Sequence, residues 1–489
     1  MPTNKNPVAP AIDDTLAFPD GDPNPVNITR ATATADSQIS AGDATQVLDE
    51  GPITGFLHLV RRAGIVLVIQ IVGAGVTYGV QVLLARLLGA SHYGTYAYVI
   101  VWVGFAALVA GLGFPAASIR FLPVYRIRKD WPRFHGFVRE ASRATFATAL
   151  AMALGTLGVA EALHASGLLA HTSVAVLGAL LVPAFAGSML YTEIARSGGQ
   201  MGVAFIPSMI VRPALIGIGA VAIFAATGAL STNAALGASL GAGYVVLAVQ
   251  YVLTRRRLDG PKAKPHPVAE RREWFGVGIS LLAAGAFTVT FMQVDIVIVG
   301  ALRGPRDAGI YAAASKTASL VSFVILAVNA AAAPQFASLW ALGRIADLQR
   351  LVSKLATLIF WPSFVISAGI AALSVPLLGL FGSEFQEARP ALLVLLVGQL
   401  VNAAAGSVGY LLTVTGHHRE ATLALGLSAV ACTLLAIAGV LAFGLVGAAL
   451  GTTLGFVLWN GSLYWLVVRK LGIHASIFSS LHMPRHRLT

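Results

Sequence analysis

Residues 64–88 read GIVLVIQIVGAGVTYGVQVLLARLL, a 25-residue stretch in which Arg86 is the sole charged side chain. A membrane-spanning α-helix needs about 20 mainly apolar residues to cross ~30 Å of hydrocarbon. This stretch is therefore long enough and apolar enough to span a bilayer, and similar stretches follow it along the chain. The sequence predicts an all-α polytopic membrane protein.

The composition supports the same fold class. The chain has 489 residues, of which 56% are hydrophobic and 11% charged, and its mean hydropathy is +0.77. A soluble domain carries about a quarter charged residues, so this chain has too few to cover a water-facing surface. The single cysteine, Cys432, excludes an intrachain disulfide.

Apolar runs divide the chain into two sets of six spans. We place the spans at about 64–88, 93–118, 138–162, 172–195, 203–227, 234–254, 274–302, 307–333, 350–380, 388–414, 421–443 and 446–468. The corresponding regions are a disordered tail (1–55), an N-terminal six-helix lobe (56–254), a basic linker (255–273), a C-terminal six-helix lobe (274–470) and a short basic tail (471–489). The first 50 residues hold eight acidic and two basic side chains and have no apolar period, which is typical of disorder.

Charge in the loops predicts the orientation. If the N-terminus is cytoplasmic, nearly all Lys and Arg residues outside the tail fall in cytoplasmic loops, the densest groups lying at 120–143 and 255–272. The outer loops then receive Arg86, Arg303, Arg306 and Arg389. This is the positive-inside pattern, so both termini are expected in the cytoplasm. The net charge of +12 is thus explained by topology, and no nucleic-acid partner is predicted.

A short motif repeats at an offset of 215 residues. Residues 87–97 read LLGASHYGTYA and residues 302–312 read LRGPRDAGIYA, so that Gly94 aligns with Gly309 and Tyr96 with Tyr311. Six spans, an even number, separate the two copies. The two lobes are therefore predicted to be parallel repeats, related by an axis along the membrane normal.

These residues carry a family resemblance over about residues 60–470. The pattern Leu-Gly-x-x-x-Tyr-Gly-x-Tyr after the first span resembles the polysaccharide transporter (O-antigen flippase) branch of the MOP exporter superfamily. Gly111, Gly113 and Arg120 near the second span, and the Leu380–Pro390 segment before the tenth, agree with that branch. The acidic tail is not part of the pattern.

The resemblance implies a MATE-like fold, with two six-helix lobes around a central cavity that opens alternately to each side. The implied cargo is a polyprenyl-diphosphate-linked oligosaccharide, moved from the cytoplasmic to the periplasmic leaflet of a bacterial inner membrane. Membrane lipid and other membrane proteins of polysaccharide assembly are the expected partners. A diphosphate and a sugar chain cannot enter hydrocarbon cheaply, so a polar, cationic path suits this cargo.

Arg212 lies about nine residues into the fifth span, beside Pro213. A charge at such a depth is costly in hydrocarbon, so it should face a cavity or a partner. We favour a contact with the diphosphate, since a guanidinium can bind phosphate oxygens in a bidentate manner. The structural alternative is a bond to a backbone carbonyl freed by Pro207 or Pro213.

Lys316 and Asp295 lie at similar depths in the eighth and seventh spans. They can pair with each other for structural reasons. Alternatively, Lys316 binds cargo and Asp295 takes part in ion coupling or gating. Arg120 is a further candidate for cargo binding, although an arginine at a span end often extends to the interface without a functional role.

Other function classes fit less well. A membrane-embedded saccharide polymerase or ligase is expected to have a sizeable outer loop with catalytic groups, whereas all the predicted outer loops are short. Glu384 and Glu387 form one isolated near-pair, and no metal-spaced His/Cys set is present, so we predict no catalytic residue, metal or cofactor. An ion-coupled multidrug exporter of the same superfamily is the closer alternative. Such an exporter would be expected to hold a membrane carboxylate in its N-terminal lobe. The interior of the N-terminal lobe of this chain is instead marked by Arg212, and a cationic site suits an anionic cargo.

Overall fold

The computed structural model describes residues 52–166, 172–258 and 270–477. Contacts divide the chain into Met1–Leu59 and a second unit, Val60–Thr489, in which all the membrane spans found lie. Most of the predicted N-terminal tail (1–51), the centre of the predicted linker (259–269) and the end of the C-terminal tail (478–489) lie outside the described residues. The described residues are almost entirely helical and include no β-strand.

The helices of the N-terminal half follow the predicted spans. They are α2 (Pro52–Ala110), α3 (Phe114–Ile127), α4 (Trp131–Ala165), α5 (Ser173–Ser197), α6 (Met201–Ile206), a π-helical turn η1 (Pro207–Val211), α7 (Arg212–Thr227) and α8 (Thr232–Arg256). The predicted second span, 93–118, differs most from the structure. Its helix is interrupted at Gly111–Gly113, where Leu112 and Gly113 have positive φ, and it continues as α3 to Ile127.

The C-terminal half is built in the same way. Its elements are α9 (Arg271–Arg303), α10 (Pro305–Ala318), a 3₁₀ turn η2 (Ser319–Val321), α11 (Ser322–Ala341), α12 (Ile345–Ala372), α13 (Ser374–Gly379), a 3₁₀ turn η3 (Ser383–Ala388), α14 (Arg389–Ala405), α15 (Val408–Val414) and α16 (His418–Leu471). The eighth span reaches Ala341 rather than 333, because α11 continues α10 after one 3₁₀ turn.

The prediction of twelve spans is confirmed. Over the described residues, ten helices are long and apolar enough to cross a membrane. Two of them, within α2 and α16, are helical hairpins that reverse at Gly89 (φ 72°) and Gly444 (φ 59°). In the first hairpin the Tyr93 hydroxyl donates to Gln81 Oε1 at 2.9 Å, which places the two arms side by side. The ten helices therefore make twelve passes.

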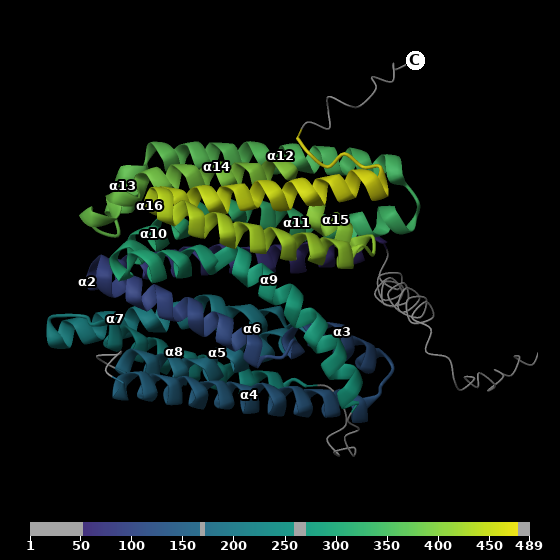
Figure 1. Ribbon diagram of the computed structural model, residues 1–489. Coiled ribbons are helices and arrows are strands. Elements are labelled where there is room, and N and C mark those ends of the chain that lie inside the picture. Colours follow the sequence, from purple (N-terminus) through teal and green to yellow (C-terminus); the bar gives the residue numbers. More distant parts are fainter. Residues whose placement is uncertain (1–51, 167–171, 259–269, 478–489) are drawn as a thin grey trace, which may run out of the picture. The chain divides into compact units, whose positions relative to one another are not determined.

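Within the unit Val60–Thr489, the helices form two lobes joined by α9 (Figure 1). In one lobe α5 packs against α3, α4 and α8, and in the other α14 packs against α12 and α16. α9 contacts both α3 and α16. Its first turns bring Trp274 into the core of the first lobe, where the indole N–H donates to the Tyr125 hydroxyl at 3.0 Å.

The two lobes share a hydrophobic core at one end of the molecule and have separate cores at the other end. We call the end that holds Arg133, Arg257, Arg344 and Arg469 the basic end, and the end with the reversals at Gly89, Gly304 and Gly444 the opposite end. Near the opposite end, one cluster of buried apolar side chains includes residues of both lobes, such as Leu84 and Phe381. At the basic end each lobe has its own cluster, around Phe137 in the first and Phe336 in the second.

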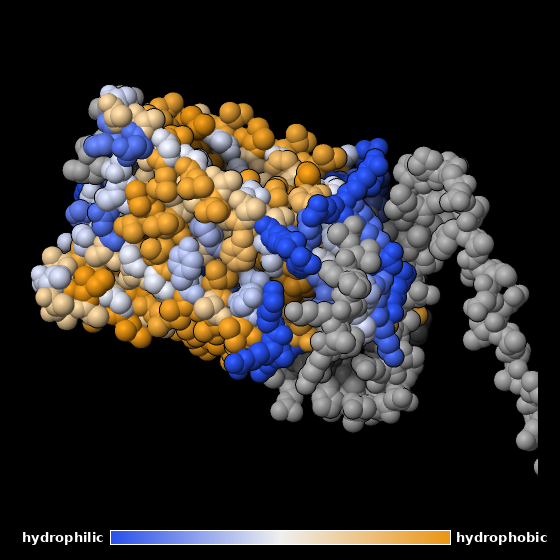
Figure 2. Space-filling model, turned by 90° about the horizontal axis from the view of Figure 1, so that it is seen from below, coloured by the Kyte–Doolittle hydropathy of each residue, from blue (hydrophilic) through white to orange (hydrophobic). Residues whose placement is uncertain are grey.

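The surface fits a bilayer. Figure 2 shows a broad hydrophobic band between two more hydrophilic ends. Large apolar side chains project from this surface, for example Leu154, Ile218 and Leu427, the last of which is 74% exposed. Large contiguous apolar surfaces are unusual on soluble monomers, whereas hydrocarbon solvates them without cost. The protein is therefore a multi-pass membrane protein.

Candidate functional site

A π-helical turn precedes Arg212. Pro207 and Pro213 both lack an N–H, so the regular helical bonding of the fifth span is interrupted twice within seven residues. The backbone N–H of Arg212 instead bonds to the carbonyl of Pro207, five residues earlier. Such π turns often occur at functional positions. α2 packs closely on this turn, because a Cβ added at Gly73 would lie 2.8 Å from Cβ of Met209.

The side chain of Arg212 is half-buried and contacts an aromatic ring. Its guanidinium carbon lies 4.6 Å from the centre of the Phe185 ring, which is a cation–π contact. It is also near enough to the Tyr96 hydroxyl to interact with it electrostatically. Among the described residues no carboxylate pairs with Arg212, and its side chain makes no hydrogen bond to a carbonyl freed by the prolines. The guanidinium N–H groups are thus left for water or a ligand.

Asp295 lies in a small network of the second lobe. Its Oδ2 accepts a hydrogen bond from the Tyr311 hydroxyl at 2.9 Å and one from Thr452 Oγ1 at 3.2 Å, and its Oδ1 accepts from the N–H of Ile296 at 2.8 Å. The side chain is 3% exposed. The carboxyl group therefore ties together α9, α10 and the second arm of α16.

Lys316 is near this network but does not complete it. It is half-buried on α10, five residues after Tyr311, and it interacts electrostatically with Asp295. Both residues are described, and no ion pair within 4.0 Å joins them; the bonds to Asp295 come from Tyr311, Thr452 and Ile296. The simple pairing considered from the sequence is thus not the main interaction of the carboxyl group.

The repeated tyrosines have equivalent positions in the two lobes. The Tyr96 hydroxyl bonds to Ser239 Oγ on α8 at 3.0 Å, and the Tyr311 hydroxyl lies 3.5 Å from Thr452 Oγ1 on α16, with which it shares the acceptor Asp295 Oδ2. In each lobe, therefore, the tyrosine of the repeated motif reaches the sixth span of its own lobe. This agrees with a parallel repeat. In the second lobe the tyrosine also meets Asp295, whereas in the first lobe Arg212 lies near it.

The two copies of the repeated motif contact each other at the opposite end. A Cβ added at Gly94 would lie 1.7 Å from the carbonyl oxygen of Pro305, and one added at Gly309 would lie 2.2 Å from that of Ala90. Pro305 aligns with Ala90 at the same offset of 215, so the contact is reciprocal. Reciprocal contacts between equivalent residues are expected at a two-fold axis.

Side chains around this contact hold the lobes together. The N–H of Ala90 donates to Glu384 Oε1 at 2.6 Å, and the Tyr93 and Phe385 rings meet edge to face at 5.9 Å. Within the second lobe, Glu387 pairs with Arg306, with Nη2 and Oε1 2.6 Å apart. The near-pair of carboxylates noted in the sequence therefore has two separate structural partners.

Arg120 lies apart from the other candidates. It is exposed on α3 toward the basic end, with its guanidinium carbon 5.9 Å from the centre of the Phe121 ring. The candidates thus fall into three places: Arg212 in the first lobe, Asp295 with Lys316 in the second, and Arg120 at the surface. Across the lobes, the Tyr78 hydroxyl lies 3.1 Å from Oγ1 of Thr317, the neighbour of Lys316.

Ion pairs at the basic end join α4 to the start of α9. Arg133 Nε lies 2.7 Å from Glu270 and Arg271 Nε lies 2.8 Å from Glu140. Arg133 also bonds to Asp130, in the turn before α4. Partial burial alone would raise the pKa of Asp130, but the hydrogen bonds and charge of Arg133 outweigh it and hold that pKa below its usual value.

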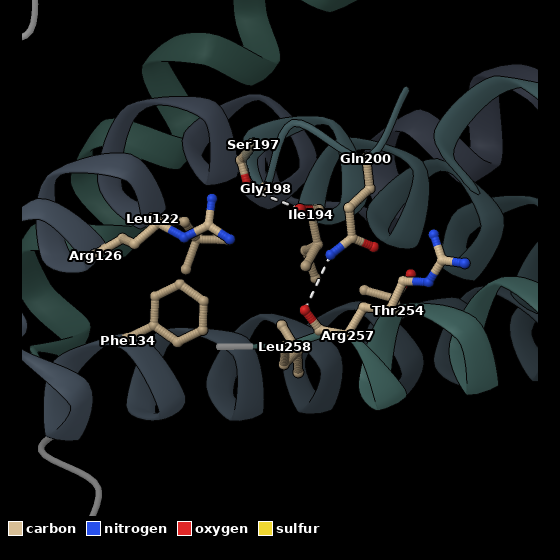
Figure 3. Close-up of a pocket in the computed structure, with 10 residues that line it drawn as sticks. All are labelled: Leu122, Arg126, Phe134, Ile194, Ser197, Gly198, Gln200, Thr254, Arg257 and Leu258. Atoms are coloured by element: carbon tan, nitrogen blue, oxygen red, sulfur yellow. Dashed lines mark hydrogen bonds between the residues drawn. The ribbon is translucent and has the colours of Figure 1, made fainter. Parts of the chain in front are cut away.

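A small pocket lies in the first lobe at the basic end (Figure 3). Its volume is ≈ 10 Å³, room for about one water molecule, so it cannot admit a saccharide. Gln200 Nε2 donates to the carbonyl of Arg257 at 3.0 Å across it. Within the described residues, the buried oxygens Gln200 Oε1 and Thr254 Oγ1 have no hydrogen-bond partner.

The sequence missed several residues of these networks. Tyr311 was marked by the repeat, but nothing in the spacing connected it with Asp295 or Thr452. Phe185 and Tyr78 looked like ordinary apolar-span residues. Contacts between distant spans depend on how the helices are rotated about their axes, and hydropathy does not determine that.

Two lobes of six spans related by a parallel repeat are an architecture found in many transporters. Comparison with solved structures gives the same fold. A multidrug resistance MATE family transporter of the MOP superfamily is similar in its inward-facing conformation, with 14% identity, a TM-score of 0.64 and coverage of 82% of this chain and 94% of that one. Its outward-facing conformation matches with 15% identity, a TM-score of 0.62 and coverage of 85% and 96%.

A third similar structure is a MOP superfamily transporter from Pyrococcus furiosus, described as having a binding pocket of reversed polarity. It is 15% identical, with a TM-score of 0.59 and coverage of 85% of this chain and 95% of that one. Among curated proteins no significant match is found. Residues 59–340 match the family described as "Polysaccharide biosynthesis protein", and the chain belongs to that family. The predicted membership of the polysaccharide transporter branch of the MOP superfamily is thereby confirmed, and the family and the fold are those of transporters.

Proposed function

We propose that the protein flips a polyprenyl-diphosphate-linked oligosaccharide from the cytoplasmic to the periplasmic leaflet of a bacterial inner membrane, for the synthesis of O-antigen, capsule or exopolysaccharide. The family supports a role in polysaccharide synthesis and the fold supports transport. In this proposal the sugar and diphosphate pass between the two lobes, while the lipid tail remains in the bilayer.

The observation that carries the proposal is the environment of the Arg212 guanidinium. A guanidinium in the middle of a span, with an aromatic ring as its contact and no carboxylate partner among the described residues, is costly unless a ligand or water meets it. A diphosphate is a suitable ligand, because its oxygens accept two parallel N–H bonds from one guanidinium. Lys316 in the second lobe supplies a second positive charge.

The separation of the lobes fits this path. The lobes share a core near the opposite end but have separate cores at the basic end. The excess of Lys and Arg at the basic end supports a cytoplasmic location for that end. In this proposal the described conformation is closed toward the periplasm, and cargo would enter between the lobes from the cytoplasmic side. Asp295 is proposed to couple transport to an ion gradient.

The test is the leaflet distribution of lipid-linked oligosaccharide in cells that lack the gene. We expect accumulation in the cytoplasmic leaflet, reversed by the wild-type gene. Arg212→Ala should reach the membrane in normal amount but lower flipping by about tenfold or more, since one charge-assisted bidentate contact contributes about 1.5–3 kcal/mol. Arg212→Lys should retain part of the activity, because it keeps the charge but not the planar fork.

Arg196→Ala is the matched control. Arg196 pairs with Glu193 at the exposed basic end, so its loss should leave flipping unchanged. Full flipping by a well-expressed Arg212→Ala variant would refute the role of Arg212. A normal leaflet distribution together with drug hypersensitivity of the deletion strain would instead indicate a multidrug exporter, the class of the multidrug resistance MATE family transporter with a similar structure.

A further inference from the structure

The two arms of α16 are closely packed over half of their length and separate over the other half. Near the reversal at Gly444, a Cβ added at Gly447 would lie 1.8 Å from the carbonyl oxygen of Gly439. Further along, Cβ atoms at Gly451 and Gly455 would lie 2.5 Å from the N of Ala436 and 2.8 Å from Cys432. Three glycines spaced four residues apart thus let the second arm approach the first, as in membrane helix pairs with small residues at the interface.

Beyond Gly455 this close packing ends and a groove opens, which we call the α16 groove. Its volume is ≈ 450 Å³ and it lies between the arms at the basic end. The first arm lines it with Leu423, Ala424, Leu427, Ser428 and Ala431, and the second with Leu458, Ser462, Trp465 and Leu466. Nearly all of these side chains are apolar, and Leu427 and Trp465 are exposed. A groove of this kind on a membrane-facing helix pair must be filled by hydrocarbon.

The length of the α16 groove matches one leaflet. On the first arm it runs from Glu420 to Ala431, which at 1.5 Å per residue is roughly 16 Å. This is about half of the ~30 Å hydrocarbon thickness. An acyl chain of a phospholipid in the leaflet at the basic end therefore fits the groove from mouth to end.

The mouth of the groove is positively charged. The Arg469 guanidinium lies 5.0 Å from the centre of the Trp465 ring, which itself lines the groove. Lys470 Nζ lies 3.6 Å from Glu420 Oε1, a loose pair in which both side chains are partly exposed. Arg419 is exposed beside them. Three basic groups against one carboxylate at the membrane interface attract an anionic head group.

We propose that the α16 groove binds one acyl chain of an anionic phospholipid, whose phosphate lies between Arg469 and Lys470 at the mouth. The lipid fills the space where the arms separate and so fixes the distance between the last two spans. This site is distinct from Arg212, Lys316 and Asp295, and it does not depend on the proposed flipping.

The test uses the purified full-length protein in nanodiscs and measures the fluorescence of Trp465. This signal is obtained by subtracting the fluorescence of the Trp465→Phe variant from that of the wild type. The probes are phosphatidylglycerol and phosphatidylcholine carrying the same brominated acyl chain, which quenches a nearby indole. We expect stronger quenching by the phosphatidylglycerol. Arg469→Gln with Lys470→Gln should abolish this preference, which can reach about thirtyfold in affinity for two basic groups near the surface.

Two further variants separate the groove from its charge. Ala424→Phe should fill the groove and reduce quenching by both lipids, whereas Arg344→Gln, at the same end in the turn before α12, should change neither. Equal quenching by the two lipids in the wild type would mean an ordinary boundary lipid and would overturn the proposal. Displacement of the phosphatidylglycerol by an equimolar polyprenyl phosphate would also overturn it, because the occupant would then be the tail of the cargo.

Discussion

Tyr96 and Tyr311 show what single residues contribute in this protein. They occupy equivalent positions in the repeat, yet one bonds to a serine hydroxyl and the other to a buried carboxyl group. A hydrogen bond to an ionised acceptor is about twice as strong as one between neutral groups. The same side chain is therefore expected to have unequal importance in the two lobes.

This inequality can be measured by thermal unfolding in detergent. Tyr311→Phe should lower the free energy of unfolding by about 1.5–3 kcal/mol, because Asp295 loses its shortest side-chain donor. Tyr96→Phe, the matched control, should lower it by about 0.5–1.5 kcal/mol. Equal losses would indicate that the Asp295 carboxyl is protonated in the membrane, and would contradict a charged coupling site.

The role of Asp295 itself can be separated from simple pairing with Lys316. Asp295→Asn should preserve folding, since the amide oxygen still accepts from Tyr311 or Thr452, but should lower ion-driven flipping by about tenfold or more. If Asp295 served to neutralise Lys316, then adding Lys316→Met would restore activity. We expect no such rescue, because the two groups are not in direct contact. Flipping in inverted vesicles with an imposed ion gradient is the measurement.

At the scale of elements, glycines determine where helices meet. Gly94 and Gly309 allow the backbones of the two copies of the repeated motif to touch. The carbonyl oxygen of Pro305 occupies the space that a Cβ at residue 94 would need. No side chain can be accommodated there without moving one lobe from the other. This contact is therefore a candidate gate at the opposite end.

Gly94→Ala should weaken that gate. A Cβ 1.7 Å from a backbone oxygen forces the lobes apart at this end, so the protein should populate conformations that are open there. Ala308, beside Gly309 in this contact, is fully buried, so labelling of Ala308→Cys by a membrane-impermeant thiol reagent should then rise several-fold. Gly237→Ala is the matched control, since nothing lies within 4 Å of a Cβ at that position. Unchanged labelling in a folded Gly94→Ala variant would show that this end does not gate access.

The sequence predicted the elements well, but it did not predict their contacts. Hydropathy is a sum over a whole span, so each of the twelve predicted spans overlaps a helix. The helix is broken at Leu112, a residue other than glycine that has a positive φ. This local break arises from close packing, because a Cβ at the neighbouring Gly113 would lie 1.8 Å from the carbonyl oxygen of Gly278 on α9. The α16 groove likewise depends on packing between the arms, which hydropathy cannot show.

At the scale of the whole molecule, the distribution of charge and the packing of the lobes both distinguish the basic end from the opposite end. The basic end carries most of the positive charge, and it is also the end at which the lobes have separate cores. If positive charge marks the cytoplasm, anionic cargo made there would meet a positive potential at the side from which it enters. The orientation of the protein is therefore the prediction on which the direction of transport depends.

Two cysteine positions test that orientation. Ser231, exposed in the turn before α8, lies at the opposite end, and Leu342, 69% exposed after α11, lies at the basic end. The native Cys432 is fully buried and should not react. In intact cells an impermeant reagent should label Ser231→Cys and not Leu342→Cys, while permeabilised cells should show both. The reverse pattern would place the basic end outside and would require cargo to move toward the cytoplasm, which contradicts export.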